Sequence, residues 1–174
     1  MPFGAAFNFP GNPSVDGQAP DGYRVTTRSR EIGVGRERFE SAADAVLSWA
    51  VHSGSGFRAV EVPDRVAVGA TSVWEVPFGP LHPRVACRVF AVVNEPRRVG
   101  FGHGALDGHP QSGWESYVVS LDEDDVVRLR IRVVWKPAAW WMRAAGPFGR
   151  LALDRLLARN LRALDPIGSS HGIR

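Results

Sequence analysis

The chain has 174 residues, 44% hydrophobic and 22% charged, which is typical of one globular domain with a single buried core. The net charge is +3, but the 20 arginines and one lysine form no basic run longer than a pair, so composition does not predict nucleic-acid binding. The chain has no apolar run near the roughly 18 residues of a membrane span, no signal-peptide pattern in Met1–Pro10 and a lone Cys87, so we expect a cytoplasmic protein without membrane insertion.

The beginning of the chain predicts an irregular arm followed by one strand and one helix. Residues 1–22 are rich in Gly, Pro, Asn and Asp, which favour turns. A strand is expected over Tyr23–Glu31, and Gly33-Val-Gly35 then breaks the strand pattern. The apolar residues of Glu37–His52 repeat with the spacing of one buried helix face, and Ser53-Gly-Ser-Gly56 ends that helix.

The middle of the chain predicts six consecutive strands. The β-rich runs are separated by Pro and Gly and lie at residues 57–62, 70–76, 84–93, 99–105, 114–121 and 126–135. In the last run, hydrophobic residues from Val127 to Trp135 alternate with Arg128, Arg130 and Arg132. This alternation predicts a dry face and a solvated arginine face.

The end of the chain predicts two helices and a tail. A short helix is expected over 138–145, and a longer one runs from Gly146-Pro147 to Leu164, with Asn160 inside its apolar stripe. Asp165-Pro166 ends this helix, and residues 166–174 are expected to be flexible. The sequence therefore predicts a single domain over 23–165.

This order of elements resembles the helix-grip fold of the START, Bet v 1 and polyketide-cyclase superfamily. We expect an α+β fold in which a curved seven-stranded antiparallel sheet surrounds a long C-terminal helix, because the dry face of such a sheet must be covered. The resemblance implies a cavity between the sheet and the last helix that holds an apolar ligand.

Several short motifs resemble a more specific family. They are Gly33-Val-Gly35 with Phe39-Glu40 and Trp49, Cys87-Arg-Val89, Gly104-Ala-Leu-Asp-Gly-His-Pro110, Pro137-Ala138 and Gly146-Pro147. Together they are similar to the uncharacterised domain-of-unknown-function family numbered nineteen-ninety, from about Phe7 to Leu164. This chain departs from the family pattern at several positions. The family has Tyr, Glu and Tyr where this chain has His103, Trp114 and Asn160, respectively. These differences imply a pocket altered for a specialised substrate.

Two residues of the predicted hairpin are candidate catalytic groups. His103 and Glu115 have the inward parity of their strands, and in a hairpin they can lie opposite each other with Cβ atoms about 5 Å apart. A carboxylate beside an imidazole in a dry cavity fixes the tautomer and favours proton abstraction. The other interpretation is a buried hydrogen-bonded pair that only fixes the hairpin.

The remaining candidates are ligand-binding residues. Trp74, Tyr117 and Trp135 are either aromatic walls of a pocket or plain core residues. Each other candidate also has two interpretations: Asn160 binds a protein group or a ligand, Trp141 gates the cavity or anchors the short helix, and His109 caps the turn or touches the ligand.

The spacing of the histidines and acidic residues matches no compact metal motif, so no metal or cofactor is expected. The leading hypothesis is a cofactor-free enzyme of polyketide-type natural-product biosynthesis that directs ring closure or dehydration of a hydrophobic small molecule by acid/base chemistry. A noncatalytic carrier or sensor of a lipid-like ligand is the alternative, and an arginine-face binder of nucleic acid or another anionic surface is a third interpretation. A monomer or a homodimer fits all three.

Overall fold

A computed structural model describes residues 6–77, 81–144 and 146–165, without the side chains of residues 147–150. Its elements follow the chain order β1 (Arg24–Val34), α1 (Arg36–Leu47), α2 (Ala50–Gly54), β2 (Arg58–Glu61), β3 (Thr71–Glu75), β4 (Arg84–Glu95), β5 (Arg98–Ala105), β6 (Gln111–Leu121), β7 (Val126–Pro137), α3 (Trp140–Ala144) and α4 (Gly146–Arg162). The expected tail at 166–174 lies outside the described residues. No helix of the described part is both long and apolar enough to cross a membrane.

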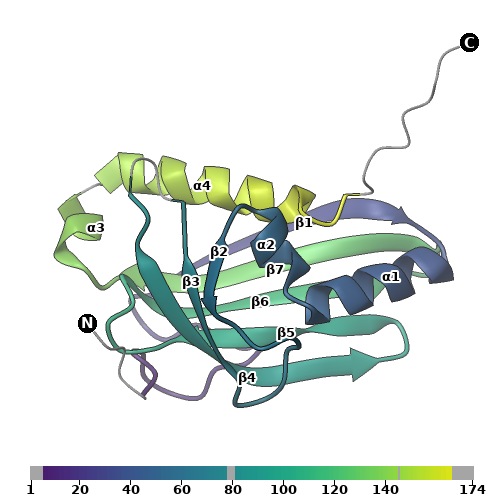
Figure 1. The fold of residues 1–174 in the computed structure, drawn as a ribbon, viewed down its shortest axis with the longest axis horizontal. Helices are drawn as coiled ribbons and strands as arrows, with labels where there is room; N and C mark the ends of the chain where they lie inside the picture. Colours follow the sequence, from purple (N-terminus) through teal and green to yellow (C-terminus); the bar gives the residue numbers. More distant parts are fainter. Residues whose placement is uncertain (1–5, 78–80, 145, 166–174) are drawn as a thin grey trace, which may run out of the picture.

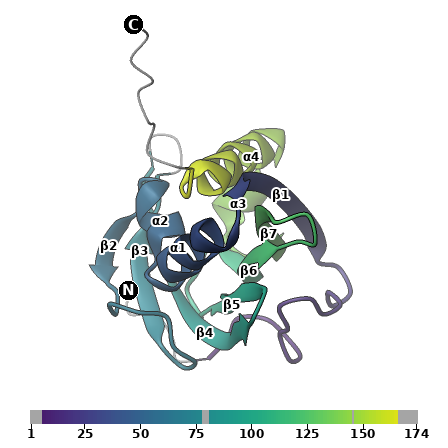
Figure 2. The same ribbon diagram turned by 90° about the vertical axis from the view of Figure 1, so that its right-hand side faces the viewer.

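The seven strands form one curved antiparallel sheet in the order β1-β7-β6-β5-β4-β3-β2. Helices α1 and α2 lie inside the curve, and α4 crosses above them from the end that carries α3 (Figures 1 and 2). The predicted α+β helix-grip architecture is confirmed. Period-two alternation explains the core, because the inward residues of β7 from Val127 to Trp135 are buried and the arginines between them face outward.

The predicted single helix over 37–52 is wrong. The chain forms α1 and the short α2 instead, because Trp49 adopts a left-handed conformation with φ of 62° between them. This break turns the indole of Trp49 into the core, where it meets Phe101 and His52. The first strand is also longer than predicted, since the chain forms a β-bulge between Glu31 and Gly33 and continues as β1 instead of ending there.

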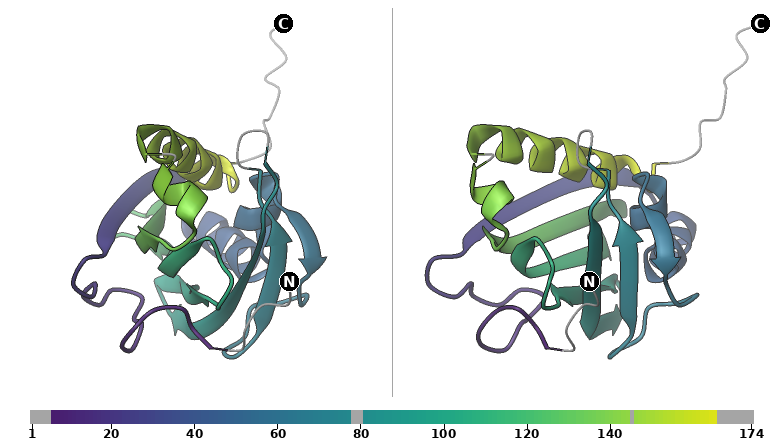
Figure 3. Two further views of the ribbon diagram at one scale, coloured as in Figure 1. Left: turned by 90° about the vertical axis from the view of Figure 1, so that its left-hand side faces the viewer. Right: turned by 60° about the vertical axis from the view of Figure 1, so that its left-hand side comes forward.

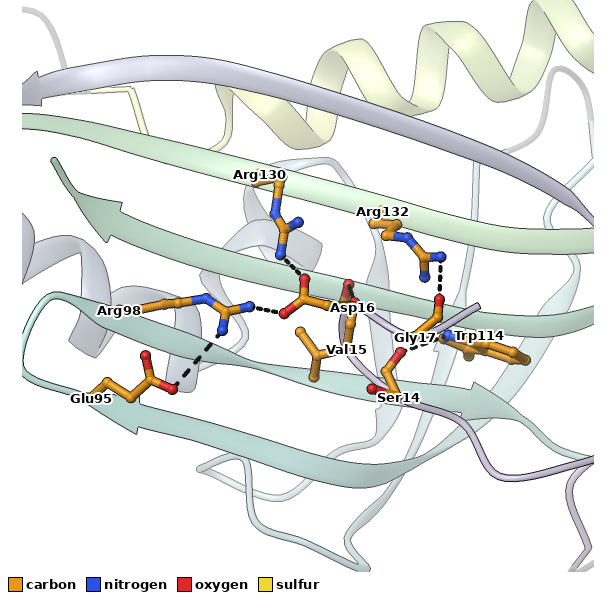
Figure 4. A network of polar contacts seen from close by, with 10 residues as sticks. Ser14, Val15, Asp16, Gly17, Glu95, Arg98, Trp114, Arg130 and Arg132 are labelled. Carbon is orange, nitrogen blue, oxygen red and sulfur yellow. Dashed lines mark hydrogen bonds and ion pairs between the residues drawn. The ribbon is translucent and has the colours of Figure 1, made fainter. Parts of the chain in front are cut away.

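The expectation of a solvated arginine face is correct for Arg128, which is exposed, but not for Arg130 and Arg132, which are partly covered. The arm before β1 lies across the outer face of the sheet, and Asp16 forms ion pairs with both Arg98 and Arg130 (Figure 4). Arg132 donates to the carbonyl oxygen of Gly17. Sequence alternation identified the outward side chains, but the partner that covers them is distant in the chain.

The outer face of β5 is shaped to receive this arm. Its outward positions include Gly102 and Gly104, so aromatic rings lie directly against the backbone. A Cβ atom at Gly104 would come within 2.7 Å of the Phe9 ring, and one at Gly102 would collide with Phe90. Phe9 in turn packs on the outward ring of Trp114, 5.1 Å away between centroids.

The arm also holds the β5–β6 hairpin, which projects below α3 in Figure 3. The backbone N–H of Asn8 donates to the carbonyl of Ala105 on one side of the hairpin. Its side-chain amide donates to the carbonyl of Gln111 at 2.7 Å on the other side, and the hydroxyl of Ser112 donates to the backbone oxygen of Asn8. Asn8 therefore ties both sides of this hairpin to the arm.

We expect Asn8→Ala to destabilise this hairpin locally by about 1–3 kcal/mol, because a part-buried carbonyl and amide lose their side-chain partner. Hydrogen exchange at the backbone amides of residues 111–113 should accelerate, whereas the exposed Asn94→Ala should leave it unchanged. Equal exchange rates in both variants would contradict the role of Asn8.

Candidate functional site

The sheet and α4 enclose a cavity of about 70 Å³. Its walls come from α2, the inward faces of β3 to β6, the hairpin, α3 and α4, and its lining residues are His52, Phe57, Trp74, Val76, Pro83, Val85, Cys87, His103, His109, Pro110, Gln111, Glu115, Trp141, Met142, Leu153, Leu156, Leu157 and Asn160. This volume has room for a few water-sized groups. A surface groove shares Pro83, His109, Pro110 and Trp141 with the lining and marks the outer end of the cavity.

The strand register brings His103 and Glu115 together on the cavity wall. The two residues are direct partners of the β5–β6 pair, and His103 Nε2 lies 3.7 Å from Glu115 Oε2. The imidazole is only 4% exposed, whereas the side chain of Glu115 keeps 26% of its area exposed. The separation is longer than a direct hydrogen bond, so the pair is in electrostatic contact.

Tyr117 is the second partner of the Glu115 carboxylate. It is fully buried two positions further along β6, and its hydroxyl donates to Glu115 Oε2. Burial and the negative charge of Glu115 hold the pKa of the Tyr117 hydroxyl well above its ordinary value. The hydroxyl therefore stays a donor, and Tyr117 supports the carboxylate from behind the lining.

The Glu115 carboxyl is ionised throughout the physiological range. Burial opposes its ionisation, but the His103 imidazole and the hydroxyl of Tyr117 outweigh that effect, with help from His52, and lower the pKa to about 2. The cavity wall therefore carries a permanent negative charge.

His52 is a lining residue that sequence reasoning missed. It lies in α2, is 2% exposed, and its ring centroid is 4.9 Å from that of Tyr117 and 5.2 Å from that of His103. Burial, assisted by the neighbouring His103 imidazole, lowers the pKa of His52 to about 3, so the His52 ring is neutral. It stands next to the Ser-Gly stretch that ends the helical pattern, and its approach to the site depends on the break at Trp49.

Four of the six predicted ligand-binding residues lie on the lining, and three of them come from β3, α3 and α4. Trp74 stacks against His52 from β3, with 5.3 Å between ring centroids, Asn160 faces in from α4, and Trp141 lies at the outer end. Its neighbour Trp140 is 75% exposed and points away from the core.

His109 is the fourth, and the two predicted residues that are not on the lining of this cavity are Tyr117, described above, and Trp135. His109 lines the cavity and caps its turn as well, since its Nδ1 accepts from the backbone N–H of Gln111 at 2.9 Å. Burial lowers the pKa of His109 to about 4. Trp135 lines an adjoining recess of about 20 Å³, which shares His103 and Glu115 with the main cavity.

Several buried polar atoms around the cavity have no hydrogen-bond partner among the described residues. They are both ring nitrogens of His52, Nδ1 of His103, Nε1 of Trp74 and Oδ1 of Asn160. Buried donors and acceptors normally find partners, so these atoms are available to a bound molecule or to water. Within the described ranges, no three His, Cys, Asp or Glu side chains are arranged to hold a metal ion.

Comparisons with known proteins find a matching family and a sequence relative. The profile of the family described as "Domain of unknown function (DUF1990)" matches residues 10–163. A UPF0548 protein of Deinococcus radiodurans is 31% identical over 153 residues, covering 80% of this chain and 72% of the relative.

Solved structures share the fold at low sequence identity. A hypothetical protein from Helicobacter pylori has a TM-score of 0.58 at 10% identity, covering 92% of this chain and 97% of its own. The major latex-like protein 151 of Panax ginseng has a TM-score of 0.53 at 11% identity, covering 83% and 99% of the two chains.

We expect the stability of the protein to fall as the pH is lowered below about 6.5. One reason is that His52 takes up a proton at a higher pH in the unfolded state than in the folded state. Its folded-state pKa of about 3 lies below the ordinary 6.5, so this loss continues down to about pH 3, on the order of 1 kcal/mol per pH unit. Denaturant unfolding at pH 7, 6 and 5 measures the slope.

His52→Phe should flatten this slope, whereas His82→Gln at an exposed position should retain it. His109 adds a trend of the same sign in all three proteins. An unchanged slope in His52→Phe would show that this ring is not buried as a neutral group.

Proposed function

This chain belongs to the DUF1990 family of unknown function, and on that premise we propose that it is a cofactor-independent acid/base enzyme acting on a largely apolar small molecule in its cavity. The observation that carries the proposal is the pairing of an ionised carboxylate with a buried imidazole on an apolar wall. Such a pair is suited to moving a proton in a site from which water is largely excluded.

The two residues would have separate roles. The Glu115 carboxylate, held by Tyr117, favours the tautomer of His103 that carries its proton on Nε2. Nδ1 of His103, which has no partner among the described residues, is then free to accept a proton from the ligand. The imidazolium formed in this step is stabilised by the adjacent carboxylate.

A dehydration or a ring closure fits this arrangement. Nδ1 of His103 takes a proton from a carbon next to a carbonyl group, and the electron pair of that bond forms an enolate. In a dehydration, the enolate forms a C=C bond as the C–O bond of a hydroxyl group breaks, and the proton on His103 leaves with that oxygen as water. In a ring closure, the enolate carbon attacks a second carbonyl group of the same molecule, and the proton passes to the new alkoxide. Polyketide-type intermediates carry such groups, which makes natural-product biosynthesis the proposed setting. A cavity of about 70 Å³ has room only for the reacting part of a long intermediate.

A second function, a noncatalytic carrier or sensor of a lipid-like ligand, is favoured by one observation. His103 and Glu115 are 3.7 Å apart, which is longer than the hydrogen bond that a working dyad forms. A carrier needs the cavity but makes no use of this proton path. Native mass spectrometry that finds a co-purified ligand released unchanged would favour this function.

Proton abstraction can be measured with 2-butanone, a small neutral ketone, in D₂O. A base in the cavity exchanges its α-protons for deuterium, which ¹H NMR records as signal loss. We expect exchange above the buffer rate, a reduction of at least about 100-fold in His103→Gln, and a smaller reduction in Glu115→Gln.

The matched control is His82→Gln, which removes an exposed imidazole and should exchange like the unaltered protein. Wild-type exchange rates in both His103→Gln and Glu115→Gln would exclude the proposed roles. Saturation-transfer signals from bound butanone without exchange would favour the carrier function.

A further inference from the structure

The cavity contrasts with the rest of the chain in its charge. The protein has 20 arginines and one lysine, yet neither residue type occurs among the described lining residues. Among the described lining residues, Glu115 is the one with a permanent charge. His52 and His109 are neutral at pH 7, since burial holds their pKa values at about 3 and about 4. The described part of the lining therefore offers a ligand a negative group and no fixed positive group.

The carboxylate of Glu115 also has unused capacity. Its contacts with Tyr117 and His103 both involve Oε2, which leaves Oε1 available to a ligand. A buried carboxylate is stabilised by a positive partner, and within the described lining only His103, when protonated, can supply one. A second anion in the same cavity would leave two negative charges facing that single partner.

The walls around this carboxylate favour a cation as well. Trp74 and His52 stack along one side, with Phe57 next to them, and Trp141 lies at the outer end. The faces of aromatic rings attract ammonium groups, most strongly where water is excluded. An ammonium group can donate to Oε1 while its carbon substituents contact these rings.

We propose that the cavity selects a small protonated amine, bound through its ammonium group to Oε1 of Glu115, and rejects carboxylates and phosphate esters. This inference rests on the proposed function, because it names the ligand class of the same cavity. Trp74 Nε1 and Asn160 Oδ1 have no hydrogen-bond partner among the described residues. Because buried polar atoms normally have one, the natural amine carries an oxygen group, such as a hydroxyl, at another point of its skeleton.

Butylamine, 1-butanol and butyrate test this selectivity because they have the same carbon chain and differ in charge. Titrations of the full-length protein at pH 7, followed by protein NMR chemical shifts, give the three dissociation constants. We expect butylamine to bind at least about tenfold more tightly than 1-butanol, and butyrate to bind more weakly than both.

In Glu115→Gln, the affinity for butylamine should fall to that for 1-butanol, while 1-butanol binding persists and shows that the variant is folded. Glu123→Gln removes an exposed carboxylate and should change none of the three constants.

Two outcomes would overturn the inference, and they differ in meaning. Equal or tighter binding of 1-butanol or butyrate contradicts the amine class and leaves the cavity function in place. Saturable binding of none of the three contradicts the cavity function itself.

Discussion

An ionised carboxylate on the wall of an apolar cavity is the constraint on which the site depends. Burial raises the pKa of Glu115, but the His103 imidazole, the Tyr117 hydroxyl and the nearby His52 ring outweigh that effect and lower it to about 2. These groups come from β6, β5 and α2. The charge is therefore stabilised only when the curved sheet and the broken helix are both in place, which ties the chemistry of the site to the fold.

The sheet supports this arrangement from its outer side. Period-two alternation places His103, Glu115 and Tyr117 inward, and the same alternation puts Gly102 and Gly104 outward. The missing side chain at Gly104 lets Phe7 and Phe9 of the arm lie against the strand, and the one at Gly102 leaves room for Phe90 of β4. The arm then holds the hairpin from which His109 lines the cavity, so an irregular segment far from the site in sequence helps to fix one of its walls.

The sequence predicted much of this because some features depend only on local periodicity. Alternation gave the strands and the inward parity of His103 and Glu115, and helical spacing placed Asn160 on the buried face of α4. His52 escaped prediction because it reaches the site through the left-handed Trp49, a conformation that no local pattern signals. The covering of Arg130 by Asp16 escaped too, because it joins residues 114 positions apart.

The two proposed properties of the cavity meet at Glu115. Oε2 of its carboxylate accepts from the Tyr117 hydroxyl and faces Nε2 of His103, and neither contact involves Oε1. An ammonium group bound to Oε1 would therefore leave the contacts that orient the imidazole in place. One carboxylate could then hold the ligand by its charged end and keep Nδ1 of His103 free toward the rest of the same molecule, so the binding and the proton transfer that we propose use different atoms of one side chain.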